Sequence, residues 1–233
     1  MVNSIRDNIM EIRAQIAAAA EKSGRGTHEI KLMGVSKYHP LEMMIEASPY
    51  VDILGENKVQ EAHEKRLGWP VDNKRAWHLI GHLQRNKARK ALEVFDLIES
   101  VDNLDLARIL DRILAESDTA AYPIYIEVNM SGELTKNGVE PCEAESLAER
   151  IIEYCPRLSV EGLMTIGPNT DDEAAIRESF VNLRELRDTM RIKTGLSLPE
   201  LSMGMSGDYK TAIEEGSTIV RIGTSIFGTR IYK

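Results

Sequence analysis

The sequence predicts an α/β fold, a single (β/α)8 barrel of the TIM type with one extra helix before the first strand. Eight short apolar segments alternate with helical patterns, and strict alternation of this kind implies a parallel sheet. Eight such units close into a barrel, whereas open doubly wound sheets usually have about five to seven strands. The 233 residues are close to the roughly 250 that such a barrel needs, so we expect one domain over residues 1–233.

The elements follow in order along the chain. Residues 4–22 carry Ile5, Ile9, Ile12, Ile16 and Ala19 at helical spacing, which predicts an amphipathic helix ahead of any strand. We expect the eight strands at residues 30–36, 51–55, 76–80, 97–101, 123–129, 160–166, 201–205 and 218–222. We expect the intervening helices at residues 40–47, 59–67, 83–94, 104–117, 143–154, 173–193 and 209–215.

Composition and charge exclude several classes of function. A formal charge of −8 argues against a general nucleic-acid binder, which would be basic. No apolar run approaches the roughly 20 residues of a membrane span, and the first residues lack the apolar stretch of a secretory signal. Cys142 and Cys155 fall in one predicted helical region, too far apart for a disulfide. We therefore expect free thiols and a cytoplasmic protein, and because nothing demands a stable oligomer, a monomer.

Lys37 is the most informative polar residue at the strand ends, where barrels of this type place their chemistry. Because side chains alternate along a strand, Met33, Val35 and Lys37 share a face. If Val35 fills the barrel interior, Lys37 points into its mouth, where partial desolvation lowers the lysine pKa and favours the neutral amine that attacks aldehydes. Position alone leaves open the alternative of a lysine that reaches solvent.

A candidate phosphate site follows the last two predicted strands. Residues 202–208 run from the seventh strand into a helix start, where Ser206 can donate its hydroxyl and unpaired N–H groups are expected. Gly223, just before Thr224, ends the eighth strand and lets an anion approach the backbone. Barrels often bind phosphate in these two loops, although two ordinary Gly/Ser turns are the alternative.

Arg221 shares a strand face with Gly223, so we expect it to point inward beneath the phosphate site. A buried arginine needs an acceptor, and the pyridine nitrogen of pyridoxal 5′-phosphate (PLP) would supply one. Since arginine keeps its proton, that nitrogen would stay unprotonated and the ring would be a poor electron sink. The alternative is an ion pair between Arg221 and an interior carboxylate.

Two further patterns have mainly structural interpretations. His78 and His82 are four residues apart, as in some zinc-binding helices, but the residues around them predict a strand and a turn. A basic patch on the helix after the third strand is by default a solvated face. It comprises Arg85, Lys87, Arg89 and Lys90, and together with Lys136 it could place positive charge near the barrel mouth.

The sequence closely resembles the pyridoxal phosphate homeostasis protein family, barrel proteins similar to the N-terminal domain of alanine racemase. The resemblance covers essentially the whole chain and rests on several ordered motifs, which are more specific together than any one alone. They lie at residues 34–37, 55–61, 77–87, 136–138, 162–166, 201–206 and 220–228. Two residues depart from the family pattern, His82 beside the basic patch and Gly207 in the phosphate loop.

The resemblance implies a role for each candidate residue. Lys37 would form the internal aldimine with PLP, Arg221 would face the pyridine nitrogen, and Asn57 would lie beside the ring. The phosphate would be held by Ser206, Gly223 and Thr224. The implied function is intracellular PLP homeostasis, in which the protein carries or buffers PLP and supplies PLP-dependent apoenzymes, with no catalytic residue and no metal.

Two enzyme classes are the alternatives. A PLP-dependent amino-acid racemase of the alanine type adds a β-rich domain that supplies an opposing catalytic base, and the eight predicted units leave no room for it. A lysine Schiff-base aldolase acting on a phosphorylated sugar would share the barrel, the lysine and the phosphate loops. A yellow colour of the purified protein would favour PLP over the aldolase.

Overall fold

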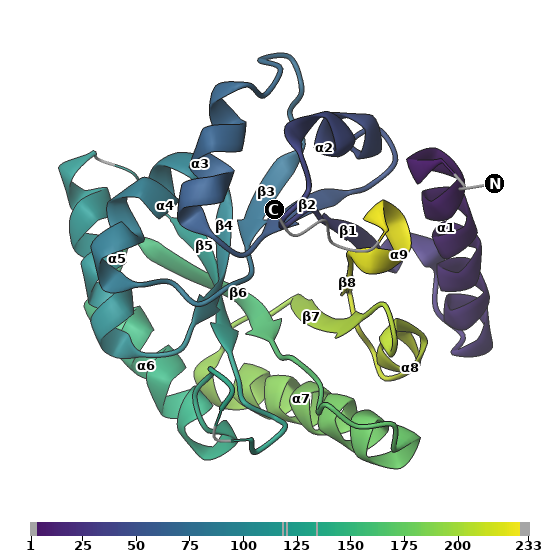
Figure 1. The fold of residues 1–233 in the computed structure, drawn as a ribbon. Coiled ribbons are helices and arrows are strands. Elements are labelled where there is room, and N and C mark those ends of the chain that lie inside the picture. Colours follow the sequence, from purple (N-terminus) through teal and green to yellow (C-terminus); the bar gives the residue numbers. More distant parts are fainter. Residues whose placement is uncertain (1–3, 118, 120, 134, 229–233) are drawn as a thin grey trace.

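The fold is a closed barrel of eight parallel strands in chain order, with β8 pairing back onto β1 (Figure 1). The computed structural model describes residues 4–117, 119, 121–133 and 135–228. Helices surround the barrel on its outside, and the first helix precedes β1. The predicted fold class is therefore confirmed.

Every predicted strand is present, with bounds that differ from the prediction by at most two residues. Strands that are buried on both faces give near-continuous apolar runs, which explains why they could be located. The strands are β1 (Lys31–Val35), β2 (Ile53–Glu56), β3 (Ala76–Leu79), β4 (Leu97–Val101), β5 (Tyr122–Glu127), β6 (Leu158–Met164), β7 (Glu200–Met205) and β8 (Ile219–Ile222).

The helices agree with the prediction except at two places. They are α1 (Ile5–Lys22), α2 (Leu41–Ala47), α3 (Val59–Leu67), α4 (Ala88–Val94), α5 (Leu104–Glu116), α6 (Ala144–Tyr154), α7 (Glu173–Thr194), α8 (Tyr209–Glu214) and α9 (Thr224–Phe227). The single helix expected over residues 83–94 starts later, as a 3-10 turn at Arg85–Lys87 that leads into α4, because Gln84 is still extended. The four-residue α9 was not predicted, since it is too short to show a helical period. No helix in the described residues is long and apolar enough to cross a membrane.

The barrel interior has its own small apolar core, separate from the larger layer between the strands and the helices. Its buried members are Met33, Val35, Ile53, Leu97, Tyr125, Met164 and Ile219. Val35 therefore faces inward, as the argument for Lys37 required. Alternate residues of the same strands face outward into the helical layer, which contains the fully buried Trp77 and Phe180.

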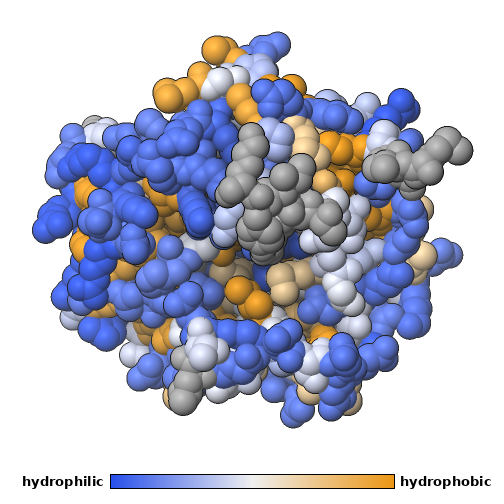
Figure 2. All heavy atoms as spheres, in the orientation of Figure 1, coloured by the Kyte–Doolittle hydropathy of each residue, from blue (hydrophilic) through white to orange (hydrophobic). Residues whose placement is uncertain are grey.

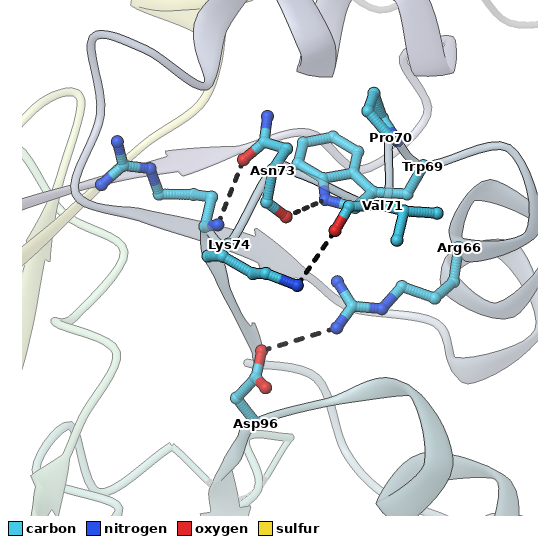
Figure 3. A pocket seen from close by; sticks show the side chains of 8 residues that line it. Arg66, Trp69, Pro70, Val71, Asn73, Lys74 and Asp96 are labelled. Carbon is cyan, nitrogen blue, oxygen red and sulfur yellow. Dashed lines mark hydrogen bonds and ion pairs between the residues drawn. The ribbon is translucent and has the colours of Figure 1, made fainter.

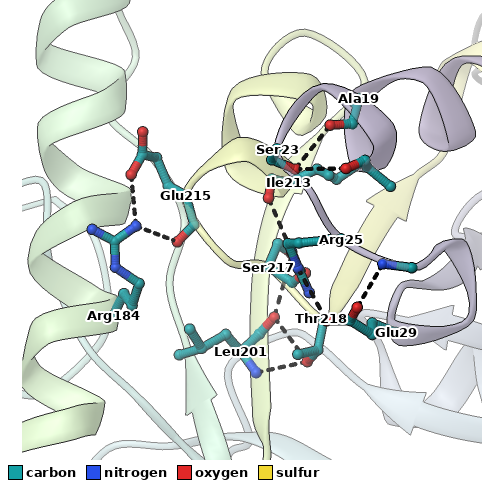
Figure 4. A network of polar contacts seen from close by, with 12 residues as sticks. Ala19, Ser23, Arg25, Glu29, Arg184, Leu201, Ile213, Glu215, Ser217 and Thr218 are labelled. Atoms are coloured by element: carbon teal, nitrogen blue, oxygen red, sulfur yellow. Dashed lines mark hydrogen bonds and ion pairs between the residues drawn. The ribbon is translucent and has the colours of Figure 1, made fainter.

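The extra helix α1 packs on the outside of the barrel beside α2, α8 and α9 (Figure 1). A capping box between Ser4 and Asp7 starts the helix. The segment after α1 is fixed by Arg25, whose Nη1 donates to the backbone oxygens of Ile213 (2.9 Å) and Ser217 (2.8 Å) (Figure 4). The N-terminal segment thus braces the turn between α8 and β8.

Candidate functional site

A pocket of about 220 Å³ lies at the carboxyl ends of the strands. Its lining consists of Val35, Lys37, Ile80, Met205, Ser206, Gly207, Arg221, Gly223 and Thr224. Five of the six residues proposed from the sequence therefore share one pocket, and Asn57 is the exception. In the same orientation as the ribbon, Figure 2 shows a few apolar spheres near the middle of the molecular face, with hydrophilic spheres below them.

Lys37 is half-buried in the turn that follows β1. The next residue, Tyr38, has a φ of 65°, a left-handed conformation that is uncommon for a residue with a large side chain. Its backbone N–H donates to Glu61 Oε1 at 2.7 Å, and the N–H of His39 donates to the Ser36 oxygen at 3.0 Å. The backbone on both sides of Lys37 is therefore fixed by hydrogen bonds.

Asn57 lies beside this turn and is not part of the pocket lining. Its side chain is hydrogen-bonded to Tyr38, which is the main reason why the pKa of the Tyr38 hydroxyl is lowered. Asn57 Oδ1 is buried and has no hydrogen-bond partner in the described part of the chain. Its backbone passes so close to Gly81 that a Cβ there would lie 2.3 Å from the Asn57 oxygen. The structure thus places Asn57 against the Lys37 turn.

The loop after β7 is tightly folded around a glycine. Gly204 has a φ of 94°, and a Cβ there would lie 2.5 Å from the Cβ of Ala212 in α8. Farther along, Asp208 Oδ1 accepts a hydrogen bond from the Met205 N–H at 2.5 Å. A Cβ on Gly207 would meet nothing within 4 Å in the described structure. The loop therefore presents Ser206 and an open backbone to the pocket.

The loop after β8 lines the pocket next to β1. Gly223 is the residue before α9, and a Cβ on it would lie 3.2 Å from the backbone oxygen of Val35. Thr224 follows and is exposed. The first N–H groups of a helix have no intrahelical acceptor, so Thr224 can offer both a hydroxyl and a backbone donor.

Arg221 is almost completely buried beneath the pocket, with 4% of its surface exposed. Its Nη1 donates to Ser202 Oγ at 2.9 Å and its Nη2 donates to the Thr165 oxygen at 2.7 Å. Ser202 in turn donates to Glu99 at 2.5 Å, and His78 Nδ1 lies 2.7 Å from the other oxygen of that carboxylate. In the described residues Arg221 therefore reaches an interior carboxylate through a serine hydroxyl, and a direct ion pair is not formed.

Burial and neighbouring charges shift the pKa values of both a base and an acid inside the barrel. Desolvation lowers the pKa of Arg221, and the carboxylates of Glu99, Asp208 and Glu127 act in the opposite direction. Burial raises the pKa of Glu127 to about 7, with Asp102 adding to the shift and Arg221 opposing it. Glu127 Oε2 has no hydrogen-bond partner among the residues described. Sequence reasoning missed Glu127, although strand alternation places it on the inward face of Tyr125.

The other polar patterns of the sequence have structural partners. His78 lies in β3 and is held by Glu99, and no group of three potential metal ligands occurs in the described residues. His82 Nδ1 lies 3.8 Å from Asp102. The basic patch is partly neutralised, because Arg85 pairs with Asp105 and Arg89 pairs with Glu116. Lys136 likewise pairs with Glu133 at 2.6 Å.

A second pocket, of about 270 Å³, lies at the opposite end of the barrel, where β3 and β4 begin (Figure 3). Trp69 forms one wall, and the guanidinium of Arg66 lies 3.9 Å from Asp96. Lys74 Nζ donates to the Val71 oxygen at 3.0 Å. Since barrels of this type carry their chemistry at the other end, this pocket is separate from the candidate site.

The fold and the pocket define a barrel protein with a lysine and two glycine-containing loops at the strand ends. The family described as alanine racemase, N-terminal domain, matches residues 7–231. Alanine racemase from Clostridium difficile superimposes with a TM-score of 0.75 over 97% of this chain and 61% of the racemase chain. At 17% identity that likeness shows the fold alone.

Two proteins are much more similar in sequence. The pyridoxal phosphate homeostasis protein of Aquifex aeolicus is 41% identical over 97% of this chain and 98% of its own length. PipY of Synechococcus elongatus, in a structure with PLP bound, has a TM-score of 0.79 and 34% identity, covering 91% of this chain and all of PipY. The chain belongs to the pyridoxal phosphate homeostasis protein family.

Proposed function

We propose that this chain binds PLP through Lys37 and acts in PLP homeostasis as an intracellular carrier or buffer. The observation that carries the proposal is the shared pocket, which brings Lys37 together with Ser206, Arg221, Gly223 and Thr224. Relatives that bear the homeostasis name, and PLP in the PipY structure, support it. In this proposal residues 1–233 act as one cofactor-binding domain.

The residues present fit each part of the cofactor. PLP supplies an aldehyde carbon, which a primary amine attacks to form a C=N bond with loss of water. Lys37 is the lysine that lines the pocket, and it can provide that amine. Ser206 and Thr224 can donate hydroxyls to the phosphate, while the open backbone at Gly207 leaves room for its oxygens. Asn57 is hydrogen-bonded to Tyr38, next to Lys37, and would lie beside the ring.

Arg221 can orient the pyridine ring. Each of its Nη atoms makes one hydrogen bond inside the barrel, which leaves Nε–H and the second N–H of each Nη without an acceptor among the described residues. Because arginine keeps its proton, one of these N–H groups would donate to the ring nitrogen and leave it unprotonated. A ring in that state withdraws electrons weakly, which suits storage better than turnover. We therefore propose that robust catalysis is absent, and amino-acid racemisation at about 1 per second or faster would overturn that part.

The test of the function is to locate the cofactor on the chain. Wild-type protein mixed with PLP should become yellow, and borohydride reduction followed by peptide mass analysis should place the cofactor on Lys37. Lys37→Ala should lose both the visible absorption and the reduced adduct. Lys58→Ala is the matched control, since Lys58 lies close by, with its Nζ 4.7 Å from the centre of the Tyr38 ring. Cofactor reduced onto Lys58 or Lys136 would show that the site is misassigned.

The remaining parts of the proposal concern the protein's surroundings. We propose a cytoplasmic monomer whose partners are PLP and PLP-dependent apoenzymes, without nucleic acid, membrane or metal. The net charge of −8 and the match to bacterial homeostasis proteins support this setting. Size-exclusion chromatography with light scattering would test the monomer directly.

A further inference from the structure

A buried charged cluster lies behind the Lys37 turn, between the barrel and α3. It consists of Glu56 at the end of β2, and Glu61 and Lys65 on α3. The Glu56 side chain is fully buried, the Lys65 side chain is 9% exposed, and that of Glu61 is 24% exposed. None of the three lines the pocket, and the proposed cofactor chemistry makes no use of them.

Lys65 is at the centre of the cluster. Its Nζ contacts three oxygens, Glu56 Oε1 and Glu61 Oε1 at 2.7 Å each and the backbone oxygen of Ser36 at 3.0 Å. The contacts to Glu56 and Ser36 are hydrogen bonds and the contact to Glu61 is an ion pair, so the three-donor ammonium group has three oxygen neighbours. Buried ion pairs contribute little net stability, because the desolvation of two charges offsets their attraction. Such a cluster is better explained by the structure that it fixes than by stabilisation of the whole fold.

The part of the structure that the cluster fixes is the backbone on both sides of Lys37. Before Lys37, the Ser36 oxygen accepts from Lys65, and Ser36 Oγ donates to Glu56 Oε1 at 2.7 Å. After it, the N–H of Tyr38 donates to Glu61 Oε1 at 2.7 Å. Tyr38 has a left-handed backbone, a conformation that persists only where its surroundings hold it. Lys37 is thus the middle residue of a turn whose flanking residues are both tied to α3 or β2.

We propose that Glu61, supported by Lys65 and Glu56, is a positioning residue for Lys37. By holding the Tyr38 N–H, Glu61 keeps the turn in the one conformation that directs the Lys37 amine into the pocket. Without this bond the amine samples several directions, so capture of the aldehyde slows. The inference rests on the proposed function and adds to it a residue outside the pocket that determines how fast PLP is taken up.

The experiment compares two substitutions at Glu61 with a control on the same helix. Glu61→Ala removes the acceptor for the Tyr38 N–H, whereas Glu61→Gln keeps a carbonyl oxygen at that place without the charge. Glu64→Ala is the control, because Glu64 is exposed on α3 and accepts its hydrogen bond from Gln60. Far-UV circular dichroism and thermal melting establish that each variant is folded, and the partial exposure of Glu61 favours this.

Two measurements are made on each protein. Hydrogen exchange of the Tyr38 amide, measured without PLP, reports on the bond itself. The rate at which visible absorbance develops after mixing with PLP reports on capture by Lys37. Glu61→Ala should speed exchange at Tyr38 and slow capture about tenfold, the effect of losing one hydrogen bond to a charged group. Glu61→Gln should restore most of both, and Glu64→Ala should match the wild type.

The outcomes separate this inference from the function on which it rests. Capture at the wild-type rate by folded Glu61→Ala would overturn the positioning role alone. Equal slowing in Glu61→Gln and Glu61→Ala would also overturn it, because the hydrogen-bond acceptor would then not matter. If wild-type protein takes up no PLP at Lys37, the proposed function fails, and the positioning role fails with it.

Discussion

Arg221 is proposed to orient the pyridine ring, and its substitution tests that role. Arg221→Lys keeps a positive charge opposite Glu99 and Glu127 but cannot reproduce both Nη bonds together with a further planar N–H donor. We expect the fold to survive, the absorption spectrum of bound PLP to change, and PLP affinity to fall about tenfold. Absorbance titration measures both effects, with far-UV circular dichroism as the control for folding. An unaltered spectrum in the PLP-loaded variant would mean that Arg221 does not contact the ring.

Arg221→Glu tests a different property, the stability of the barrel interior. Arg221→Glu would place a carboxylate near Glu99 and Glu127 and remove the guanidinium that attracts both. Unpaired buried charge of this kind costs about 3–5 kcal/mol, so we expect a protein that unfolds at lower denaturant concentration or fails to accumulate. The lysine variant is therefore the cleaner test of the ring contact.

Glu127 makes the stability of the barrel depend on pH. Its pKa is about 7 in the folded protein, mainly because of burial, and returns to about 4.3 on unfolding. Between these values the folded state holds a proton that the unfolded state has lost, so stability falls as pH rises and levels off above about 7. Glu127→Gln removes this penalty and should stabilise the protein at pH 8 by about 1–3 kcal/mol, with little gain at pH 5. Urea unfolding at both pH values measures the difference, and the same gain at pH 5 as at pH 8 would contradict it.

The sequence could indicate individual pocket residues because they end strands. Strand alternation placed Lys37 and Arg221 on inward faces, and the structure has both in one pocket. Their partners could not be found in the same way. Ser202 and Glu99 are 103 residues apart, and their bond crosses the barrel, so no local spacing reveals it. The acceptor for Tyr38 on α3 was hidden for the same reason.

At the scale of elements, the contact between β7 and α8 determines the shape of the Ser206 loop. Gly204→Ala would add a Cβ 2.5 Å from Ala212 and 2.9 Å from the Tyr209 Cα, in a left-handed backbone. We expect a loss of about 2–4 kcal/mol in stability and weaker PLP binding, because α8 must move away from the strand. Gly195→Ala is the control, since Gly195 is also left-handed but a Cβ there meets nothing within 4 Å in the described structure.

The control should lose about 1 kcal/mol and bind PLP normally, because it carries the backbone strain without the clash. Chemical denaturation and PLP titration of the two variants distinguish the effects. Equal losses of stability would mean that the approach of α8 to β7 tolerates a methyl group, and that the left-handed backbone is the only constraint.

The elements themselves could be predicted because each has an apolar period of its own. The strongly periodic helix α5 begins at the expected residue, and its Asn103 cap explains why, with Oδ1 accepting from the Leu106 N–H at 2.9 Å. The break before α4 and the existence of α9 depend on tertiary contacts. The backbone of Gln84 is extended in the connection between β3 and α4. The helix α9 contacts α1, which is about 200 residues distant in sequence.

At the scale of the whole molecule, the number of strands determines the architecture. Eight βα units predicted a closed barrel, and closure required β8 to pair with β1, which it does from Lys31 and Ile219 onward. The distribution of charge was harder to anticipate. The basic patch was predicted to be a solvated face that could place positive charge near the mouth; Arg85 and Arg89 are exposed as predicted, but each pairs with an acid on α5. Ion pairing between helices depends on their packing, which the sequence of one helix does not contain.

This charge distribution leads to a prediction about how PLP leaves the protein. A bond between an amine and an aldehyde is reversible, so water or another amine would release a cofactor that is bound through Lys37 as proposed. With two of the four basic-patch residues paired and a net charge of −8, the surface offers little attraction to an anion in transit. We therefore expect release into solution, so that PLP-loaded protein reactivates an unrelated PLP-dependent apoenzyme, and an added trap for free PLP abolishes most of that reactivation. Activity recovered equally with and without the trap would demonstrate direct transfer between the two proteins, and no reactivation in either condition would leave storage as the role of the barrel.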